Sequence, residues 1–149
     1  MTLKQQVHRA LVSLIDQKII ELEVILNETI EATSSDSKSS AGDKHETGVA
    51  MAQLEQEKLS KQLNELLIQK NKIKTLNPEI AHVKIGLGSL VETNNGWYYF
   101  SIGYGLITIN NESIYTLNPN APLGQAMLGK VTGDNVIFQS KSIQILNVC

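Results

Sequence analysis

The sequence predicts an α+β protein. An N-terminal antiparallel coiled-coil hairpin of two α-helices occupies residues 1–77, and a small antiparallel β domain with one short helix occupies residues 78–149. The first half carries apolar residues at helical spacing and lacks proline, whereas the second half holds eight of the ten glycines and short β-branched runs. The change falls at Asn77-Pro78, because the residue before a proline is pushed out of the helical region.

Two long amphipathic segments predict the hairpin. Residues 3–33 contain neither glycine nor proline, and residues 45–76 contain only Gly48. Neither helix could bury its apolar stripe alone, so the simplest solution is an antiparallel pair in which each helix covers the other. The expected stripe is Val7, Leu11, Leu14, Ile15, Ile19, Leu22, Ile25, Leu26 and Ile30 with Leu54, Leu59, Leu63, Leu66, Leu67 and Ile73.

A serine-rich stretch at residues 34–42 joins the two helices and predicts a loop, with the tip of the hairpin near residues 34–47. Composition alone favours a flexible connection without a function of its own. Such a tip is also where a scaffold can present contact residues.

Turn residues divide the second half into short strands. We expect strands at 83–91, 97–102, 106–109, 113–117, 136–138 and 143–148, and one short helix at 123–128. The intervening Asn, Gly, Asp and Pro residues supply the turns.

Composition excludes several classes of protein. The chain has 13 basic and 15 acidic residues and a net charge of −2, which disfavours an unaided duplex binder. Its single cysteine, Cys149, leaves no internal disulfide or cysteine-rich zinc site. Without an apolar run long enough for a membrane span or an export signal, we expect a cytoplasmic protein.

Asp43 and Glu46 are the most informative polar residues. Three residues apart at a helix start, they share one face. One interpretation is structural, with Asp43 as the N-cap and Glu46 completing a capping box. The other is a pair of exposed carboxylates that holds a hard cation together with ligands from a partner. His45 lies between them and has no assigned role.

Two motifs resemble those of the Gre family of bacterial transcript cleavage factors. The first is Gly42-Asp43-x-x-Glu46 after a long helix. The second is Ala121-Pro122-Leu123-Gly124-Gln125-Ala126-Met127-Leu128-Gly129-Lys130 followed by Gly133-Asp134-x-Val136, which resembles the family's S-P-[IL]-G-x-A-L-L-G-K-x-x-G-D-x-V signature without a gap.

The resemblance implies a fold, a partner and a mechanism. The β domain would be FKBP-like, and the protein would be a monomeric accessory factor of bacterial RNA polymerase rather than an enzyme. Its coiled coil would enter the secondary channel, where Asp43 and Glu46 help to hold the second Mg²⁺ of the polymerase. It would have no cofactor of its own, no membrane contact, and only indirect contact with the 3′ end of the nascent RNA.

The resemblance also marks a candidate polymerase-binding region. Its residues are Pro122, Leu123, Gly124, Leu128, Gly129, Lys130, Gly133 and Asp134, and part of this motif is expected to be structural.

The sequence departs from the family pattern immediately after Glu46. The family has Asn-Ala-[ED]-Tyr there, and this chain has Thr47-Gly48-Val49-Ala50. A factor that occupies the channel and regulates or inhibits without cleavage is therefore the alternative. Two further hypotheses stay open, because a fold does not determine a function. They are a stand-alone FKBP-like enzyme and a structural or chaperone-like coiled-coil protein.

Overall fold

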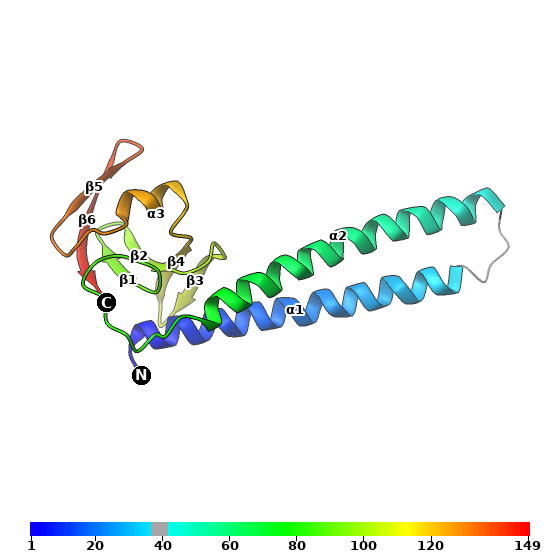
Figure 1. The fold of residues 1–149 in the computed structure, drawn as a ribbon, viewed down its shortest axis with the longest axis horizontal. Helices are drawn as coiled ribbons and strands as arrows, with labels where there is room; N and C mark the ends of the chain where they lie inside the picture. Colours follow the sequence, from blue (N-terminus) through cyan, green and yellow to red (C-terminus); the bar gives the residue numbers. More distant parts are fainter. Residues whose placement is uncertain (37–41) are drawn as a thin grey trace. The chain divides into compact units, whose positions relative to one another are not determined.

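The computed structural model describes residues 1–36 and 42–149, with only the backbone described for 33–36 and 42–45. The elements follow the order of an α+β protein, two long helices and then six strands with one short helix (Figure 1). Their contacts form two compact units, one of Ser13–Lys70 and one of Met1–Val12 with Asn71–Cys149.

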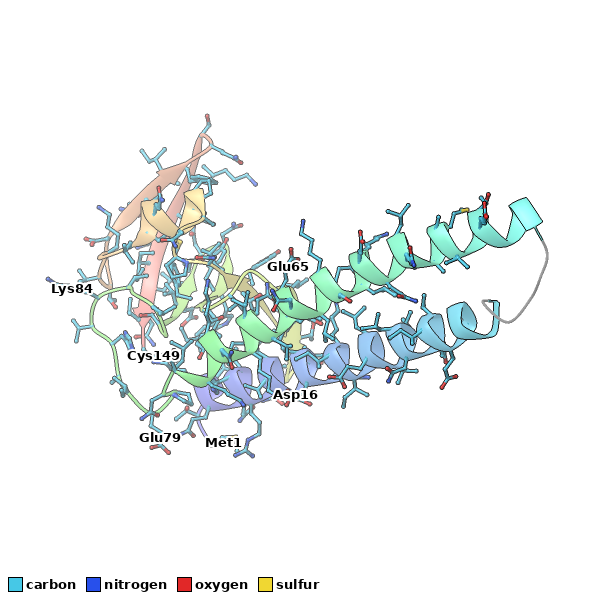
Figure 2. The ribbon with its side chains drawn as sticks, turned by 45° about the vertical axis from the view of Figure 1, so that its right-hand side comes forward. Met1, Asp16, Glu65, Glu79, Lys84 and Cys149 are labelled. Carbon is cyan, nitrogen blue, oxygen red and sulfur yellow. The ribbon has the colours of Figure 1, made fainter. Side chains whose placement is uncertain are left out.

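The Ser13–Lys70 unit consists of parts of helices α1 (Leu3–Asp36) and α2 (Gly42–Lys74), which run antiparallel. Lys70 Nζ on α2 lies 2.6 Å from Oδ1 of Asp16 on α1. Asp16 is labelled in Figure 2. Nearer the other end, Gln56 Nε2 donates to the Thr29 carbonyl oxygen at 3.3 Å. Both contacts join the two helices in antiparallel register.

The seam of this helix pair follows a heptad pattern. The buried and half-buried apolar positions alternate in steps of four and three residues, as in a coiled coil. They are Ile15, Ile19, Leu22 and Leu26 on α1 and Leu59, Leu63 and Leu66 on α2. The predicted stripe was too wide: Ile25, Ile30, Leu54 and Leu67 are exposed. The sequence has apolar residues on both sides of the seam, and only one heptad series can face the partner helix.

The other unit combines a sheet with the ends of both long helices. The strand order is β3-β4-β2-β1-β6-β5. The strands are β1 (Leu90–Thr93), β2 (Gly96–Phe100), β3 (Gly105–Ile109), β4 (Glu112–Leu117), β5 (Asn135–Phe138) and β6 (Lys141–Val148). All neighbouring pairs are antiparallel except β2 and β4, which pair in parallel.

Helix α3 (Pro122–Met127), the strands β1, β2, β5 and β6, and the segment at Ile85 contribute the core of this unit. Its buried members are Ile85, Val91, Tyr98, Phe100, Met127, Val136, Ile143, Ile145 and Val148. Val7 and Leu11 of α1 are fully buried as well.

The predicted strand at residues 83–91 is wrong for most of its length. Only its end belongs to β1, which begins at Leu90. Gly88 adopts a φ of 93°, which places a turn before the strand. Ile85 pairs its backbone with the segment after α3 instead: its N–H donates to the Lys130 carbonyl at 2.9 Å, and its own carbonyl accepts from Gly129 N at 2.8 Å.

No helix in the described parts of the chain combines the length and apolar character that a membrane crossing requires.

Candidate functional site

The first candidate site is the beginning of α2, where the backbone places both acidic residues in the first two turns. The helix begins at Gly42, so Asp43 is its second residue and Glu46 its fifth. The predicted capping box depends on the Asp43 side chain and on the residue before Gly42, and both lie outside the described residues. An acidic residue inside the first turn still stabilises a helix, because it interacts favourably with the partial positive charge of the N-terminus.

The surroundings of this acid pair are described in part. Glu46 is exposed, as are Thr47 and Ala50, whereas the side chains of Asp43 and His45 lie outside the described residues. The predicted loop at 34–42 falls partly on 37–41, which also lie outside them. The flanking predicted loop residues are helical, since α1 extends to Asp36 and α2 begins at Gly42.

By residue type, the two carboxylates at this helix start could supply part of the ligand set of a cation. Within the described side chains, no group of three or more His, Cys, Asp or Glu could hold a metal ion. Two carboxylates at a spacing of three residues supply hard oxygen ligands, but Mg²⁺ requires six ligands in near-octahedral geometry. The remaining ligands would have to come from water and from a partner.

The second candidate site is the motif around α3. Ala121 precedes the helix in an extended conformation and Pro122 occupies its first turn, where a missing N–H costs nothing. Gly124 is buried against the preceding segment: a Cβ at this position would lie 2.5 Å from the Asn118 carbonyl oxygen and 2.8 Å from that of Pro119. The glycine of the motif therefore permits a close backbone contact.

The second part of the motif forms a turn that is held by its own aspartate. Asp134 Oδ2 accepts from the Val131 N–H at 2.9 Å, and the Asp134 carbonyl accepts from the Ile145 N–H at 2.8 Å. Gly133 has a φ of 96°, which favours glycine, and its N–H donates to the Ile145 carbonyl at 2.8 Å. Gly129 and Lys130 exchange backbone hydrogen bonds with Ile85.

These contacts divide the eight predicted polymerase-binding residues. Gly124 is buried, and Leu123 and Asp134 are half-buried, which is consistent with a structural role. The exposed side chains are Pro122, Leu128 and Lys130. Leu128 is 50% exposed although it is a large apolar residue, so these three supply the only side chains of the predicted set that are well placed to contact another protein.

Sequence reasoning missed a cluster of partly and fully buried titratable groups in the unit that contains the sheet. Lys4 Nζ donates to the Ile80 carbonyl at 2.7 Å, and burial lowers the pKa of Lys4. His8 Nδ1 lies 2.8 Å from Tyr99 Oη. Burial lowers the pKa of His82 as well, assisted by the positive charge of Lys4. The apolar stripe at Val7 and Leu11 was the one sequence signal for this cluster, because it indicates that this part of the helix is buried.

Neither the scan against models of known protein families nor the search of curated proteins finds a match for this chain.

Proposed function

We propose that the protein is a transcription elongation factor that binds bacterial RNA polymerase, inserts its helical hairpin into the secondary channel, and stimulates Mg²⁺-dependent cleavage of backtracked RNA. The observation that carries the proposal is the combination of two motifs in their expected structural contexts. Gly42 begins the second of two long antiparallel helices with Asp43 and Glu46 in its first two turns, and the Pro122–Asp134 motif forms α3 and the turn after it.

In this mechanism the chain supplies ligands and the polymerase supplies the catalytic centre. Asp43 and Glu46 would help to hold a second Mg²⁺ at that centre, and the metal would supply the activation of water for attack on the RNA backbone. Asp43 and Glu46 contribute carboxylate oxygens and negative charge from one helix face. The exposure of Glu46 supports this role, because a side chain that coordinates a metal ion in another protein must be accessible at the surface.

We further propose that the sheet with α3 is an FKBP-like domain that docks on the polymerase through Pro122, Leu128 and Lys130. The six-stranded, mostly antiparallel sheet with one short helix supports this assignment. The factor would act in the cytoplasm as a monomer and take its metal only in the complex. A stand-alone FKBP-like enzyme is the less favoured function for the same domain.

The alternative is a regulator that occupies the channel without stimulating cleavage. One observation favours it: Thr47-Gly48-Val49-Ala50 stand where the family has Asn-Ala-[ED]-Tyr, so an acidic residue and a tyrosine beside the acid pair are missing.

The experiment that distinguishes these functions uses the full chain and a backtracked polymerase complex. The double variant D43N/E46Q removes two negative charges while it keeps side-chain size, and E55Q/E57Q is a charge-matched control farther along α2. We expect D43N/E46Q to bind polymerase and lose cleavage stimulation, whereas the control retains both. Binding without cleavage by the unmodified protein would support the non-cleaving regulator, and absence of binding would refute both functions.

A further inference from the structure

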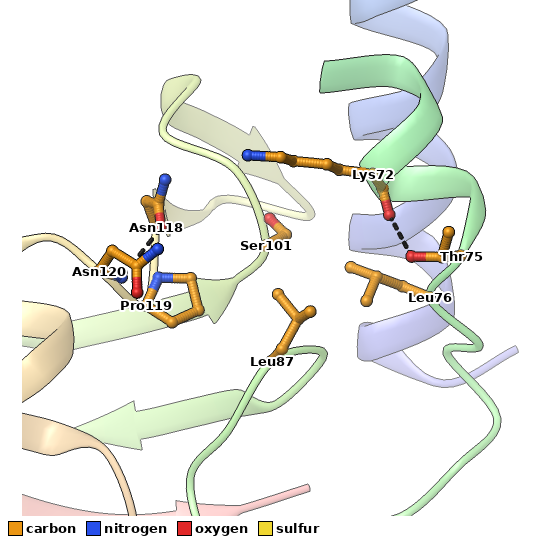
Figure 3. A pocket seen from close by; sticks show the side chains of 8 residues that line it. All are labelled: Lys72, Thr75, Leu76, Leu87, Ser101, Asn118, Pro119 and Asn120. Carbon is orange, nitrogen blue, oxygen red and sulfur yellow. Dashed lines mark hydrogen bonds between the residues drawn. The ribbon is translucent and has the colours of Figure 1, made fainter. Parts of the chain in front are cut away.

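An open cavity of about 290 Å³ lies in the unit formed by Met1–Val12 and Asn71–Cys149. Four segments line it: the end of α2, the turn before β1, the residue after β2, and the segment between β4 and α3. Figure 3 shows these segments facing one another across the opening. By volume it is about twice as large as a 150 Å³ protein cavity that accommodates benzene, so a small organic molecule would fit.

A buried hydroxyl on the wall of this cavity lacks a partner. Ser101 is only 4% exposed, and its Oγ has no hydrogen-bond partner among the described residues. Its backbone is fixed, because the Ser101 N–H donates to the Leu117 carbonyl at 2.9 Å. A buried polar atom without a partner is uncommon and costs free energy, so a ligand that pairs with this hydroxyl would be favoured.

Two further donors lie on the same cavity. Asn118 Oδ1 accepts from the Asn120 N–H at 2.9 Å, which fixes the orientation of the amide and leaves its Nδ2 as a donor. The Lys72 side chain extends across the opening with its ammonium directed toward Asn118 (Figure 3). None of the residues that line the cavity is acidic. One cation and two neutral donors without a competing carboxylate are suited to an anion.

The remaining wall is apolar. Leu76, Leu87 and Pro119 line the cavity, and Leu87 is 53% exposed although it is a large aliphatic residue. A ligand with a short hydrocarbon portion would remove this surface from water, which is favourable in proportion to the area covered. Binding sites for small molecules commonly combine such an apolar wall with a few placed polar groups.

The charge of the site favours a monoanion. Lys72 supplies a single positive charge, and it lies in the last turn of α2, where the unpaired carbonyl groups carry partial negative charge. One of these, the Lys72 carbonyl, already accepts from the Thr75 hydroxyl at 2.7 Å. A dianionic phosphate would meet one ammonium and an unfavourable helix end, whereas a carboxylate needs only one counter-charge.

We propose that this cavity binds a small organic carboxylate, whose head group accepts from Lys72, Ser101 and Asn118 and whose hydrocarbon portion covers Leu76, Leu87 and Pro119. The site does not depend on polymerase binding, and either proposal can fail without the other.

The test is a titration of the full-length protein, followed by the backbone amide signals of Leu87, Ser101 and Asn118 in ¹H–¹⁵N NMR spectra. The probes are hexanoate, its neutral isostere hexanamide, and inorganic phosphate. We expect saturable shifts with hexanoate, at least several-fold weaker binding of hexanamide, and no displacement of hexanoate by equimolar phosphate. Equal binding of hexanamide would overturn the anion assignment, tighter binding of phosphate would overturn the carboxylate assignment, and no saturable shift would overturn the site.

Matched variants test the individual donors. K72M should weaken hexanoate binding roughly ten-fold, as expected for the loss of a hydrogen bond to a charged group, whereas K74M, which changes an exposed lysine outside the cavity, should not. S101A should weaken hexanoate binding while the free protein keeps or gains thermal stability, because the variant removes a buried unpaired hydroxyl. If K74M and K72M weaken binding equally, or S101A leaves it unchanged, the proposed contacts are wrong.

Discussion

The imidazole of His8 on α1 and the hydroxyl of Tyr99 on β2 form a hydrogen bond with 2.8 Å between Nδ1 and Oη. The two rings meet edge to face, with an interplanar angle of 88°. Tyr99 is fully buried, and burial raises its pKa, so the phenol keeps its proton. We therefore assign the phenol as the donor and neutral His8 as the acceptor through Nδ1.

The burial of His8 predicts that the free energy of unfolding falls in mild acid. Burial lowers the pKa of His8 below its ordinary value of 6.5 in the folded chain, so below that pH the unfolded chain binds a proton first. The contribution of neutral His8 to the free energy of unfolding is fully present above about pH 6.5. It decreases as the pH falls toward the lowered pKa of His8 in the folded chain. The slope contributed by one histidine is at most about 1.4 kcal/mol per pH unit. Urea denaturation between pH 7.5 and 5 measures it.

Single variants separate this effect from that of His82, whose pKa is lowered too. We expect H8Q to flatten part of the acid dependence and H82Q to flatten another part. An acid slope that stays unchanged in H8Q would show that His8 is not the group that titrates.

Periodicity and turn residues predicted most of the secondary structure, because most segments have a strong local signal, and the strand at residues 83–91 is the exception. The helices at Leu3–Asp36 and Gly42–Lys74 lie within about three residues of the predicted ends, and the hairpin of β3 and β4 follows from Asn110-Asn111, both of which adopt positive φ. The parallel pairing of β2 with β4 had no such signal. Which strands become neighbours depends on packing across the whole sheet.

The candidate sites were predictable only where a motif carried them. Asp43, Glu46 and the Pro122–Asp134 motif could be found by spacing. The cavity could not, because Lys72, Ser101 and Asn118 come from segments far apart in the chain and each is an ordinary surface residue type. For the burial of Lys4 the only signal was its place on the same helix face as Val7 and Leu11, since lysine is rarely buried without a partner group such as the Ile80 carbonyl.

The G124A substitution should destabilise the fold. Its Cβ would collide with two backbone carbonyls, and backbone cannot move aside as the end of a flexible side chain can. Overpacking of this kind typically costs about 1–3 kcal/mol. G103A is the control, because apart from its chain neighbours no described atom lies within 4 Å of the position that its methyl group would take, and the substitution restricts the unfolded chain. Chemical denaturation of both variants measures the difference, and a stable G124A would show that the Asn118–Pro119 segment yields easily.

The ion pair between Asp16 and Lys70 should contribute little to the stability of the helix pair. The contacting oxygen, Asp16 Oδ1, is buried, but the two side chains as a whole are 41% and 28% exposed, and ion pairs between side chains this exposed are screened by solvent. A double-mutant cycle with D16N and K70M should give a coupling energy below about 1 kcal/mol that falls further in high salt. A coupling well above this value, insensitive to salt, would indicate that the pair is shielded from water.

The thiol of Cys149 should react slowly in the folded protein, and two neighbours should change its rate in opposite directions. Burial raises the pKa of the Cys149 thiol, the Lys4 charge opposes that rise, and the Glu92 charge adds to it. The thiol also donates to the Leu90 carbonyl at 3.3 Å, which favours its protonated form. Because only the thiolate is nucleophilic, K4M should slow labelling by a thiol reagent and E92Q should accelerate it.

Cys149 is the single cysteine, so the total labelling rate reports this thiol alone. The measurement compares folded protein with urea-unfolded protein at one pH, where the wild type and both variants should react at the same, faster rate. Equal acceleration of folded K4M and E92Q would mean that both substitutions loosen the fold around the thiol. In that case local opening, rather than the two neighbouring charges, governs its reactivity.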